Sequence, residues 1–246
     1  MWFFRVSFAS FGMALLLAAC QPELTTLPPA PSPMIWQVQI TPALRWLEPV
    51  FKQCSTEQPG IALVLSEHSA SNLEPGSVDF SFQWGEPQSP APFMAVIAND
   101  ELTVIVHLSN PNGTLSLDDL AGLYSGQAER WKSPPNVCPS CTVGFDGPVQ
   151  PYSYAQGEDV QTAANWIQAG PKTRLAPDPE AVRQAVANDP YAIGYVPAHW
   201  VDPTVKRVKL EGIAPGLLQQ PILAITAAEP QGSRRSWLLC VQEKLR

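Results

Sequence analysis

The chain has 246 residues, 45% of them hydrophobic, which is enough for one two-lobed unit or two small domains. Its formal net charge of −7 argues against a nucleic-acid partner and against an electrostatic membrane patch. Any anionic ligand would have to be attracted by local dipoles rather than by the field of the whole protein.

The N-terminus has the pattern of an export signal. Residues 1–19 carry one charge, Arg5, before an apolar run, which indicates a secretory signal rather than a spanning helix. Leu17-Ala18-Ala19-Cys20 has the form of a lipoprotein box and predicts that Cys20 is acylated. The alternative is an ordinary signal peptide followed by an unrelated cysteine. Residues 20–33 are proline-rich and predict an extended tether. The mature protein is therefore expected in the periplasm or on the outer cell surface, held to the membrane by lipid alone.

Strands and helices are expected to alternate from Trp36 onward. Residues 36–40 predict a strand, and Thr41-Pro42 then supply an N-cap and a proline at the first helical position. Pro49 lies inside this helix and is expected to kink it. Residues 61–65 and 78–85 predict two more strands. The buried face of the helix would consist of Leu44, Leu47, Val50 or Phe51, and Cys54.

The segment from Leu102 to Trp131 joins an apolar strand to a helix with defined ends. Residues 102–108 predict a strand covered on both faces, as in a parallel sheet. After a turn, Ser116 and Asp119 predict a capping box and Gly126 a helix stop. Leu115 would pack on Leu120, and the buried face would consist of Leu117, Leu120, Ala121 and Tyr124.

The alternation continues in the second half of the chain. Residues 149–154 predict a strand, 158–168 a helix, Asp178-Pro179 the start of another helix, and the segment around Ile193 a further strand. Alternating strands and helices are typical of the α/β class, with a mainly parallel sheet flanked by helices.

The five cysteines of this exported chain predict one lipid site and two disulfides. Cys138 and Cys141 lie in one loop and predict a local disulfide, with a redox dithiol or half of a metal site as alternatives. A redox motif would open a helix, and no second Cys or His pair completes a metal set, so no metal is predicted. Cys54 and Cys240 remain as the second pair, and a bond between them would close nearly the whole folded unit.

No combination of residues predicts an enzyme. His68, His107 and His199 are isolated in the sequence, and the chain lacks a nucleophile elbow, a metal-binding His pair and a phosphate-gripping loop. His107 ends an apolar strand and is interpreted as a core or hinge histidine. We predict neither catalysis nor a cofactor.

Two segments resemble a known family. LSLDDLAGLYSGQAERW at 115–131, after an apolar strand and an Asn-Pro turn, and NDPYAIGYV at 188–196 resemble phosphate-type (type II) solute-binding proteins of bacterial ABC importers, the periplasmic-binding-protein (PBP) fold. The resemblance implies two α/β lobes, with the chain crossing between them near 102–108 and 221–226. Lobe one would contain residues 34–101 and 222–246, including a last helix at 233–245, and lobe two residues 102–221. A Cys54–Cys240 bond agrees with this topology.

The resemblance also implies a ligand site between the lobes, where helix N-termini and backbone amides hold the solute. From lobe one we expect Thr41, at a helix start, and Trp84-Gly85, at a strand end where parallel sheets place their crevices. Simpler interpretations are a capping role for Thr41 and a core position for Trp84. From lobe two we expect Ser153, Tyr154, Gln156 and Gly157.

The sequence departs from the family at this second wall. Phosphate binders usually place an arginine before a Ser-Gly-Thr opening, whereas this chain has no arginine there and carries Glu158 and Asp159. These carboxylates would repel phosphate, so we predict a neutral or cationic organic solute, with Tyr152, Tyr154 and Trp84 as stacking faces.

Two hypotheses follow. The first is a monomeric solute receptor that delivers a small molecule to an ABC permease. The second is a ligand-free structural or sensor-interaction lipoprotein that keeps the binding-protein fold.

Overall fold

The structure, a computed structural model, describes residues 32–87, 90–131, 145–214 and 216–246. The predicted signal sequence, Cys20 with most of the tether, and the Cys138–Cys141 pair lie outside the described residues. Residues 33–246 form one unit by their contacts.

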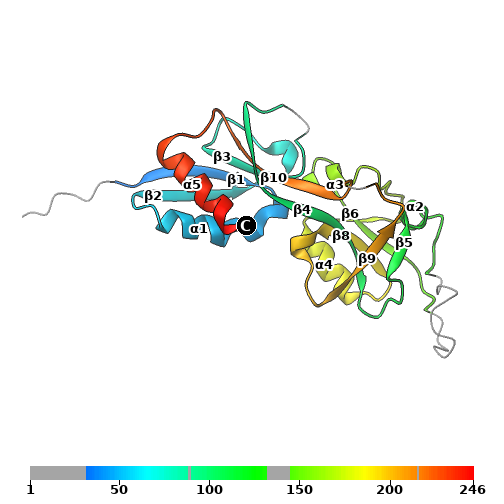
Figure 1. Cartoon of the computed structure of the whole chain (residues 1–246). Helices are drawn as coiled ribbons and strands as arrows, with labels where there is room; N and C mark the ends of the chain where they lie inside the picture. Colours follow the sequence, from blue (N-terminus) through cyan, green and yellow to red (C-terminus); the bar gives the residue numbers. More distant parts are fainter. Residues whose placement is uncertain (1–31, 88–89, 132–144, 215) are drawn as a thin grey trace, which may run out of the picture. The chain divides into compact units, whose positions relative to one another are not determined.

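Strands and helices alternate along part of this unit, as predicted, but the strands from Phe80 to Ser116 and the two from Val205 to Thr226 follow one another with no described helix between them (Figure 1). The strands are β1 (Met34–Ile40), β2 (Ile61–Glu67), β3 (Phe80–Trp84), β4 (Phe93–His107), β5 (Thr114–Ser116), β6 (Gln150–Tyr154), β7 (Arg174–Ala176), β8 (Ala192–Pro197), β9 (Val205–Glu211) and β10 (Gln219–Thr226). The helices are α1 (Glu48–Thr56), α2 (Leu117–Ser125), α3 (Asp159–Ala163), α4 (Pro179–Asn188) and α5 (Gly232–Lys244), with short 3-10 helices η1 (Pro42–Leu47), η2 (Ala70–Asn72) and η3 (Ala198–Trp200).

The strands join in the order β2-β1-β3-β10-β4-β8-β6-β7, and β9 pairs with both β4 and β5. β1 is parallel to β2 and β3, β6 is parallel to β7 and β8, and β5 is parallel to β9. The antiparallel pairings of the described strands all involve β4 or β10. The predicted α/β class with flanking helices is confirmed.

β4 is the strand that both halves of the sheet share. Residues 93–101 pair with β10, and residues 102–106 pair with β8, in both cases antiparallel. The strand predicted at 102–108 is buried as expected, but its predicted length and parallel setting are wrong. The first part of β4, residues 93–101, was not predicted because Asn99, Asp100 and Glu101 are poor strand formers. Pairing with β10 keeps these residues extended.

The helix predicted after Thr41 is in fact two helices. η1 ends at Leu47, and α1 begins at Glu48 with Pro49 in its first turn. Proline fits this position because the backbone N–H there has no helical partner. The kink predicted at Pro49 is therefore a helix boundary. The predicted buried face is confirmed for Leu44, Leu47, Phe51 and Cys54.

Helix ends were easier to predict than helix faces and lengths. The capping box of Ser116 and Asp119 is confirmed, and Gly126 ends α2 with φ 83°. The buried face of α2 is Leu120, Leu123 and Tyr124, so the prediction of Ala121 is wrong. The helix predicted at 158–168 is only the five-residue α3, because the chain turns at Ala164.

The packing of α1 and α5 against β1 and β3 forms an aromatic core. The Trp237 ring centroid lies 4.9 Å from that of Phe80 and 5.4 Å from that of Phe51. Cys54 of α1 and Cys240 of α5 are joined by a disulfide, which confirms the predicted pair.

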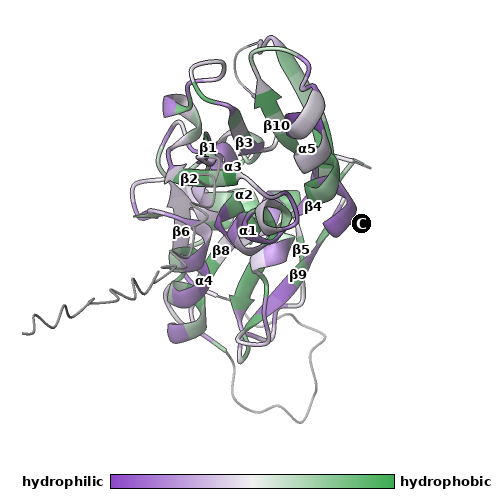
Figure 2. Cartoon of the chain, turned by 90° about the vertical axis from the view of Figure 1, so that its left-hand side faces the viewer, coloured by the Kyte–Doolittle hydropathy of each residue, from purple (hydrophilic) through white to green (hydrophobic). Residues whose placement is uncertain are grey.

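Figure 2 shows hydrophobic residues on β4 and β10 and hydrophilic residues on α4. In the described part of the chain, no helix is long and apolar enough to cross a membrane.

Candidate functional site

The ends of β1 and β3 form the first wall of the candidate site. The Thr41 backbone N–H donates to the Phe82 carbonyl (3.2 Å), which holds the two strand ends together. Thr41 and Trp84 are fully buried, and the Trp84 indole Nε1–H donates to Asp100 (3.1 Å). The Thr41 side chain does not cap η1, so its buried hydroxyl is free to face another group.

Gly85 continues this wall. Its φ of 79° favours glycine, and a Cβ there would lie 3.2 Å from the Gln220 side-chain oxygen. The Gly85 backbone N–H donates to the Pro221 carbonyl of β10 (2.7 Å). The turn after β3 is thereby fixed to β10, the strand of the second predicted crossing.

The predicted residues of β6 belong to a buried hydrogen-bond network. The Ser153 hydroxyl lies 2.6 Å from both the Tyr195 hydroxyl and the Gln161 side-chain oxygen. The Tyr154 hydroxyl donates to the Tyr195 carbonyl (2.8 Å). Burial raises the pKa of Tyr195 to about 12, so its hydroxyl stays protonated and donates to Gln161. Ser153 and Tyr154 are therefore hydrogen-bonded within the protein.

The loop between β6 and α3 reaches the first wall. Gln156 is exposed, whereas the Gly157 carbonyl accepts a hydrogen bond from the Ser71 backbone N–H (3.0 Å). Gly157 has φ 91°, and a Cβ there would lie 2.7 Å from the Ser71 hydroxyl oxygen. Only glycine fits both the conformation and this contact without rearrangement.

Replacing Gly157 with alanine should lower the free energy of unfolding by about 1–3 kcal/mol, because a positive φ is strained for alanine and Ser71 must move. Chemical denaturation measures the loss. Gly113 lacks a positive φ and has open space around its Cβ position, so Gly113→Ala is the matched control. Equal effects of the two substitutions would contradict the contact.

Asp159 brings a carboxylate from the second wall to the first. It is 2% exposed, and its two oxygens accept hydrogen bonds from the backbone N–H groups of Trp84 (3.2 Å) and Val160 (2.8 Å). Burial, with a small contribution from the nearby Glu158, raises the pKa of Asp159 to about 7 against the lowering effects of Thr41, Val160 and Trp84. The Thr41 hydroxyl acts on the carboxylate although its geometry falls short of a regular hydrogen bond.

Arg45 of η1 makes a second link to the later part of the chain. Its guanidinium pairs with Glu67 (2.7 Å), Asp178 (3.1 Å) and Glu180 (3.3 Å). Glu67 and, less strongly, Asp178 raise the pKa of Arg45 against the lowering effect of burial. Asp178 also caps α4 through the Ala181 backbone N–H, as predicted. Arg45 is thus engaged by three carboxylates and is not available to grip an anion.

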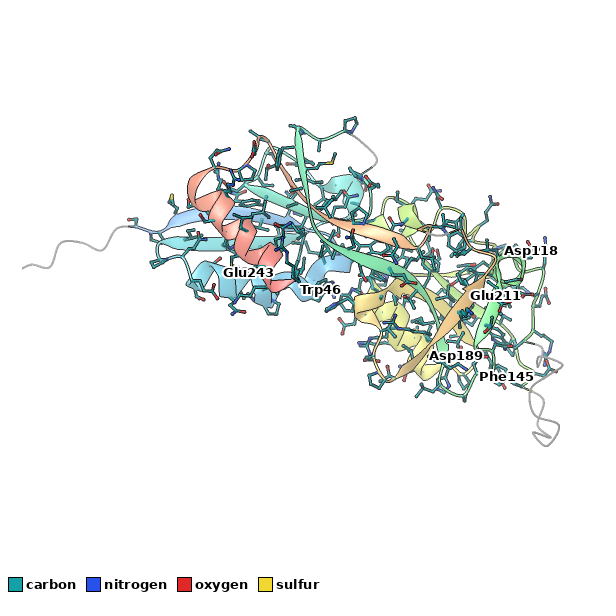
Figure 3. All side chains as sticks on the ribbon, in the orientation of Figure 1. Trp46, Asp118, Phe145, Asp189, Glu211 and Glu243 are labelled. Atoms are coloured by element: carbon teal, nitrogen blue, oxygen red, sulfur yellow. A yellow bond between two sulfur atoms is a disulfide. The ribbon has the colours of Figure 1, made fainter. Side chains whose placement is uncertain are left out.

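An aromatic contact lies beside this ion cluster. The rings of Trp46 and His199 stack with centroids 3.5 Å apart, and the Trp200 Nε1–H donates to the Ala43 carbonyl (2.8 Å). Burial lowers the pKa of His199, which keeps its ring neutral against the indole. Trp46 lies near the C-terminal end of α5 (Figure 3). With His199 and Asp100 it lines an open pocket of about 460 Å³.

The predicted site residues are brought together only in part. Thr41 and Trp84 meet the start of α3 at Asp159, while Ser153 and Tyr154 face Tyr195 and Gln161. The sequence flagged Asp159 only as a charge and missed Arg45 and Trp46 as contacts with the later part of the chain. The sequence signal for Asp159 was a pair of carboxylates, Glu158 and Asp159, that follows Gly157 at the start of a helix. No group of three or more potential metal ligands occurs in the described ranges.

A model of the PBP superfamily domain matches residues 91–230, more than half of the chain. The chain belongs to the PBP superfamily. The PBP fold places it among proteins built from mixed α/β lobes, and the predicted resemblance is confirmed. Among curated protein sequences none matches it.

Solved structures confirm the PBP-like fold. A Clostridium perfringens protein assigned as a phosphate ABC transporter substrate-binding protein, with bound phosphate, matches with a TM-score of 0.65 at 17% identity, over 85% of this chain and 93% of that one. An ABC-type phosphate transport receptor from Vibrio cholerae matches with a TM-score of 0.59 at 15% identity, over 84% and 93%. The CcmR regulatory domain of Synechocystis PCC6803 with 2-PG matches with a TM-score of 0.59 at 12% identity, over 86% and 97%. At these identities the likeness shows the fold alone.

Proposed function

We propose that this protein is a lipid-anchored, extracytoplasmic solute-binding receptor of the ABC-importer type, in which the solute is held between two lobes. Lobe one would comprise residues 34–101 and 222–246, and lobe two residues 102–221. The proposal rests on one observation above all: the end of β3 meets the start of α3 through the Trp84–Asp159 hydrogen bond, and η2 meets the β6–α3 loop through the Ser71–Gly157 hydrogen bond. Ligands of open α/β sheets bind at such strand ends.

Thr41, Trp84 and Ser153 are buried while these hydrogen bonds are in place. The hydrogen bonds would therefore have to break before a solute could reach these residues. Binding would then replace contacts within the protein by contacts with the solute. Membership of the PBP superfamily and the likeness to phosphate receptors support this role, with delivery to a permease as its purpose. We take the receptor to be a monomer without enzymatic activity, metal or cofactor.

The lipid anchor is the part of the proposal carried by sequence alone. Leu17-Ala18-Ala19-Cys20 would direct acylation of Cys20, and the tether would hold the domain off the bilayer. Cys20→Ser should release the protein from the membrane fraction, with loss of the acyl group seen by mass spectrometry. A wild-type protein without an acyl group, together with an unchanged membrane fraction for the variant, would contradict the anchor.

Phosphate is not the expected solute. Arg45 is occupied by Glu67, Asp178 and Glu180, and a carboxylate already lies at the strand ends. A buried phosphate needs charge-assisted donors to replace its water. Isothermal titration at low salt, where weak anion binding is most visible, should give no saturable phosphate binding in the micromolar range. Saturable micromolar binding would show that an arginine leaves its partners to reach the site.

The hydrogen-bond network of Ser153, Tyr195 and Gln161 favours a second function, a ligand-free structural or sensor-interaction lipoprotein, because these polar groups satisfy one another. A thermal-shift panel of amino acids, amines, sugars and oxyanions separates the two. A receptor should gain melting temperature with one solute class, and the gain should follow mass action. A flat response across the panel would favour the second function.

A further inference from the structure

Two polar groups at the ends of β1 and β3 are buried and turned toward the β6–α3 loop. The Trp84 backbone N–H donates to the Asp159 carboxylate (3.2 Å), and the Thr41 hydroxyl makes no regular hydrogen bond. A buried N–H without an acceptor destabilises the folded protein, because it loses the hydrogen bond that it makes to water in the unfolded chain. This pair of donors therefore requires an acceptor, and a negatively charged oxygen is the strongest one available.

The acceptor in this structure comes from the chain itself. Asp159 lies 75 residues after Trp84, and its carboxylate is as buried as the donors that it meets. One oxygen binds the Trp84 N–H, and the other binds the N–H of Val160 at the start of α3. Its neighbour Glu158 is half-buried, and its side chain makes no capping hydrogen bond at the start of α3. The Trp84 N–H is therefore satisfied by the Asp159 carboxylate itself, and not by the general negative charge of the loop.

We propose that Asp159 is a built-in substitute for an anionic solute: its carboxylate takes the place that a free oxyanion would take on Trp84 and Thr41, and so determines which solutes the cleft accepts. The inference rests on the proposed function only in treating these strand ends as a ligand subsite. A free oxyanion and Asp159 compete for the same donors, and the carboxylate has the advantage of an intramolecular partner.

Free oxyanions are excluded from the donors of Trp84 and Thr41 for two physical reasons. An oxyanion that displaces Asp159 leaves a carboxylate to be accommodated elsewhere, and one that binds beside it puts two negative charges in a buried site. A neutral solute or a cation meets neither cost, and a cation would gain a carboxylate partner. The accepted class is therefore neutral or cationic small molecules, and oxyanions are rejected.

Sulfate titration of Asp159→Ala by calorimetry at pH 8 tests the inference, with wild type and Glu158→Gln measured in parallel. Asp159→Ala uncovers the Trp84 N–H and the Thr41 hydroxyl, so sulfate should bind at least about tenfold more tightly than to wild type. Glu158→Gln removes an equal charge one residue away and should behave as wild type. Circular dichroism and melting temperature establish that each variant is folded, and Asp159→Ser repeats the test with a smaller change in polarity.

Equal sulfate affinity of Asp159→Ala and wild type would overturn the inference. An equal gain in affinity in Glu158→Gln would overturn it as well, because the loss of one negative charge would then explain the whole effect. Variants of Asp159 that remain unfolded even in sulfate would contradict it too, because a free anion would then have failed to replace the carboxylate. These outcomes concern anions and variants only. Failure of the receptor proposal would instead be a wild type that binds no solute of any class.

Discussion

Replacing Cys54 and Cys240 together with alanine should lower the free energy of unfolding by about 3–5 kcal/mol. The disulfide joins residues 186 positions apart, and in the chain-entropy model so long a loop stabilises by roughly 5 kcal/mol before native-state strain is subtracted. The bond also holds α1 against α5 where Phe51 and Trp237 pack. Denaturant unfolding of the variant and of oxidised wild type measures the difference.

The matched control removes the other predicted disulfide, Cys138 with Cys141. These cysteines are separated by only two residues, so the same entropic argument gives a much smaller loss for Cys138→Ala with Cys141→Ala. Equal losses in the two double variants would contradict the loop-length explanation. An unchanged unfolding midpoint in the Cys54 and Cys240 variant would show that the bond does not form.

Asp159 should make the protein more stable in mild acid than it would be without this residue. Its pKa is about 7 in the folded protein against 3.8 for an ordinary aspartate. Because the folded pKa is raised, the folded state binds the proton more tightly. The stability from this proton is fully present below about pH 4 and is lost as the pH rises toward 7. At 1.36 kcal/mol per pKa unit the change is on the order of 4 kcal/mol.

Other groups titrate in the opposite direction. Hydrogen bonding from Ser116 lowers the pKa of Asp119, and hydrogen bonding from Thr204 lowers that of Asp202. Burial lowers the pKa of His199. Each of these shifts makes the folded protein less stable as the pH falls. The informative quantity is therefore the stability of Asp159→Asn minus that of wild type, measured by denaturation from pH 4.5 to 8. This difference should rise with pH. Parallel curves for the two proteins would contradict the raised pKa.

Local signals predicted the parts of the fold that depend on a few neighbouring residues. Ser116, Asp119 and Gly126 specify the ends of α2 through hydrogen bonds and backbone conformation within one turn. Asp178 specifies the start of α4 in the same way. The apolar run at 102–106 predicted a buried strand, because a short run rich in β-branched residues suits a strand covered on both faces.

Features that depend on distant partners were not predictable from the sequence. The segment Asn99-Asp100-Glu101 is extended because β10 pairs with it, and β10 comes more than 100 residues later. The same holds for the candidate site, where Arg45 meets Asp178 and Trp84 meets Asp159 across 133 and 75 residues. The sequence indicated that carboxylates stand where the family has an arginine, but not that one of them fills the subsite.

The most direct measurement is the titration of Asp159 itself by NMR, following its carboxyl carbon and the Trp84 amide nitrogen together from about pH 2.5 to pH 9. Both signals should change with a shared midpoint near 7, and the Trp84 change should be absent from Asp159→Asn, because the carboxylate is buried and accepts the Trp84 N–H. A midpoint near the ordinary value of 3.8, with a Trp84 amide that ignores it, would show that the carboxylate lies in solvent and that the subsite is open.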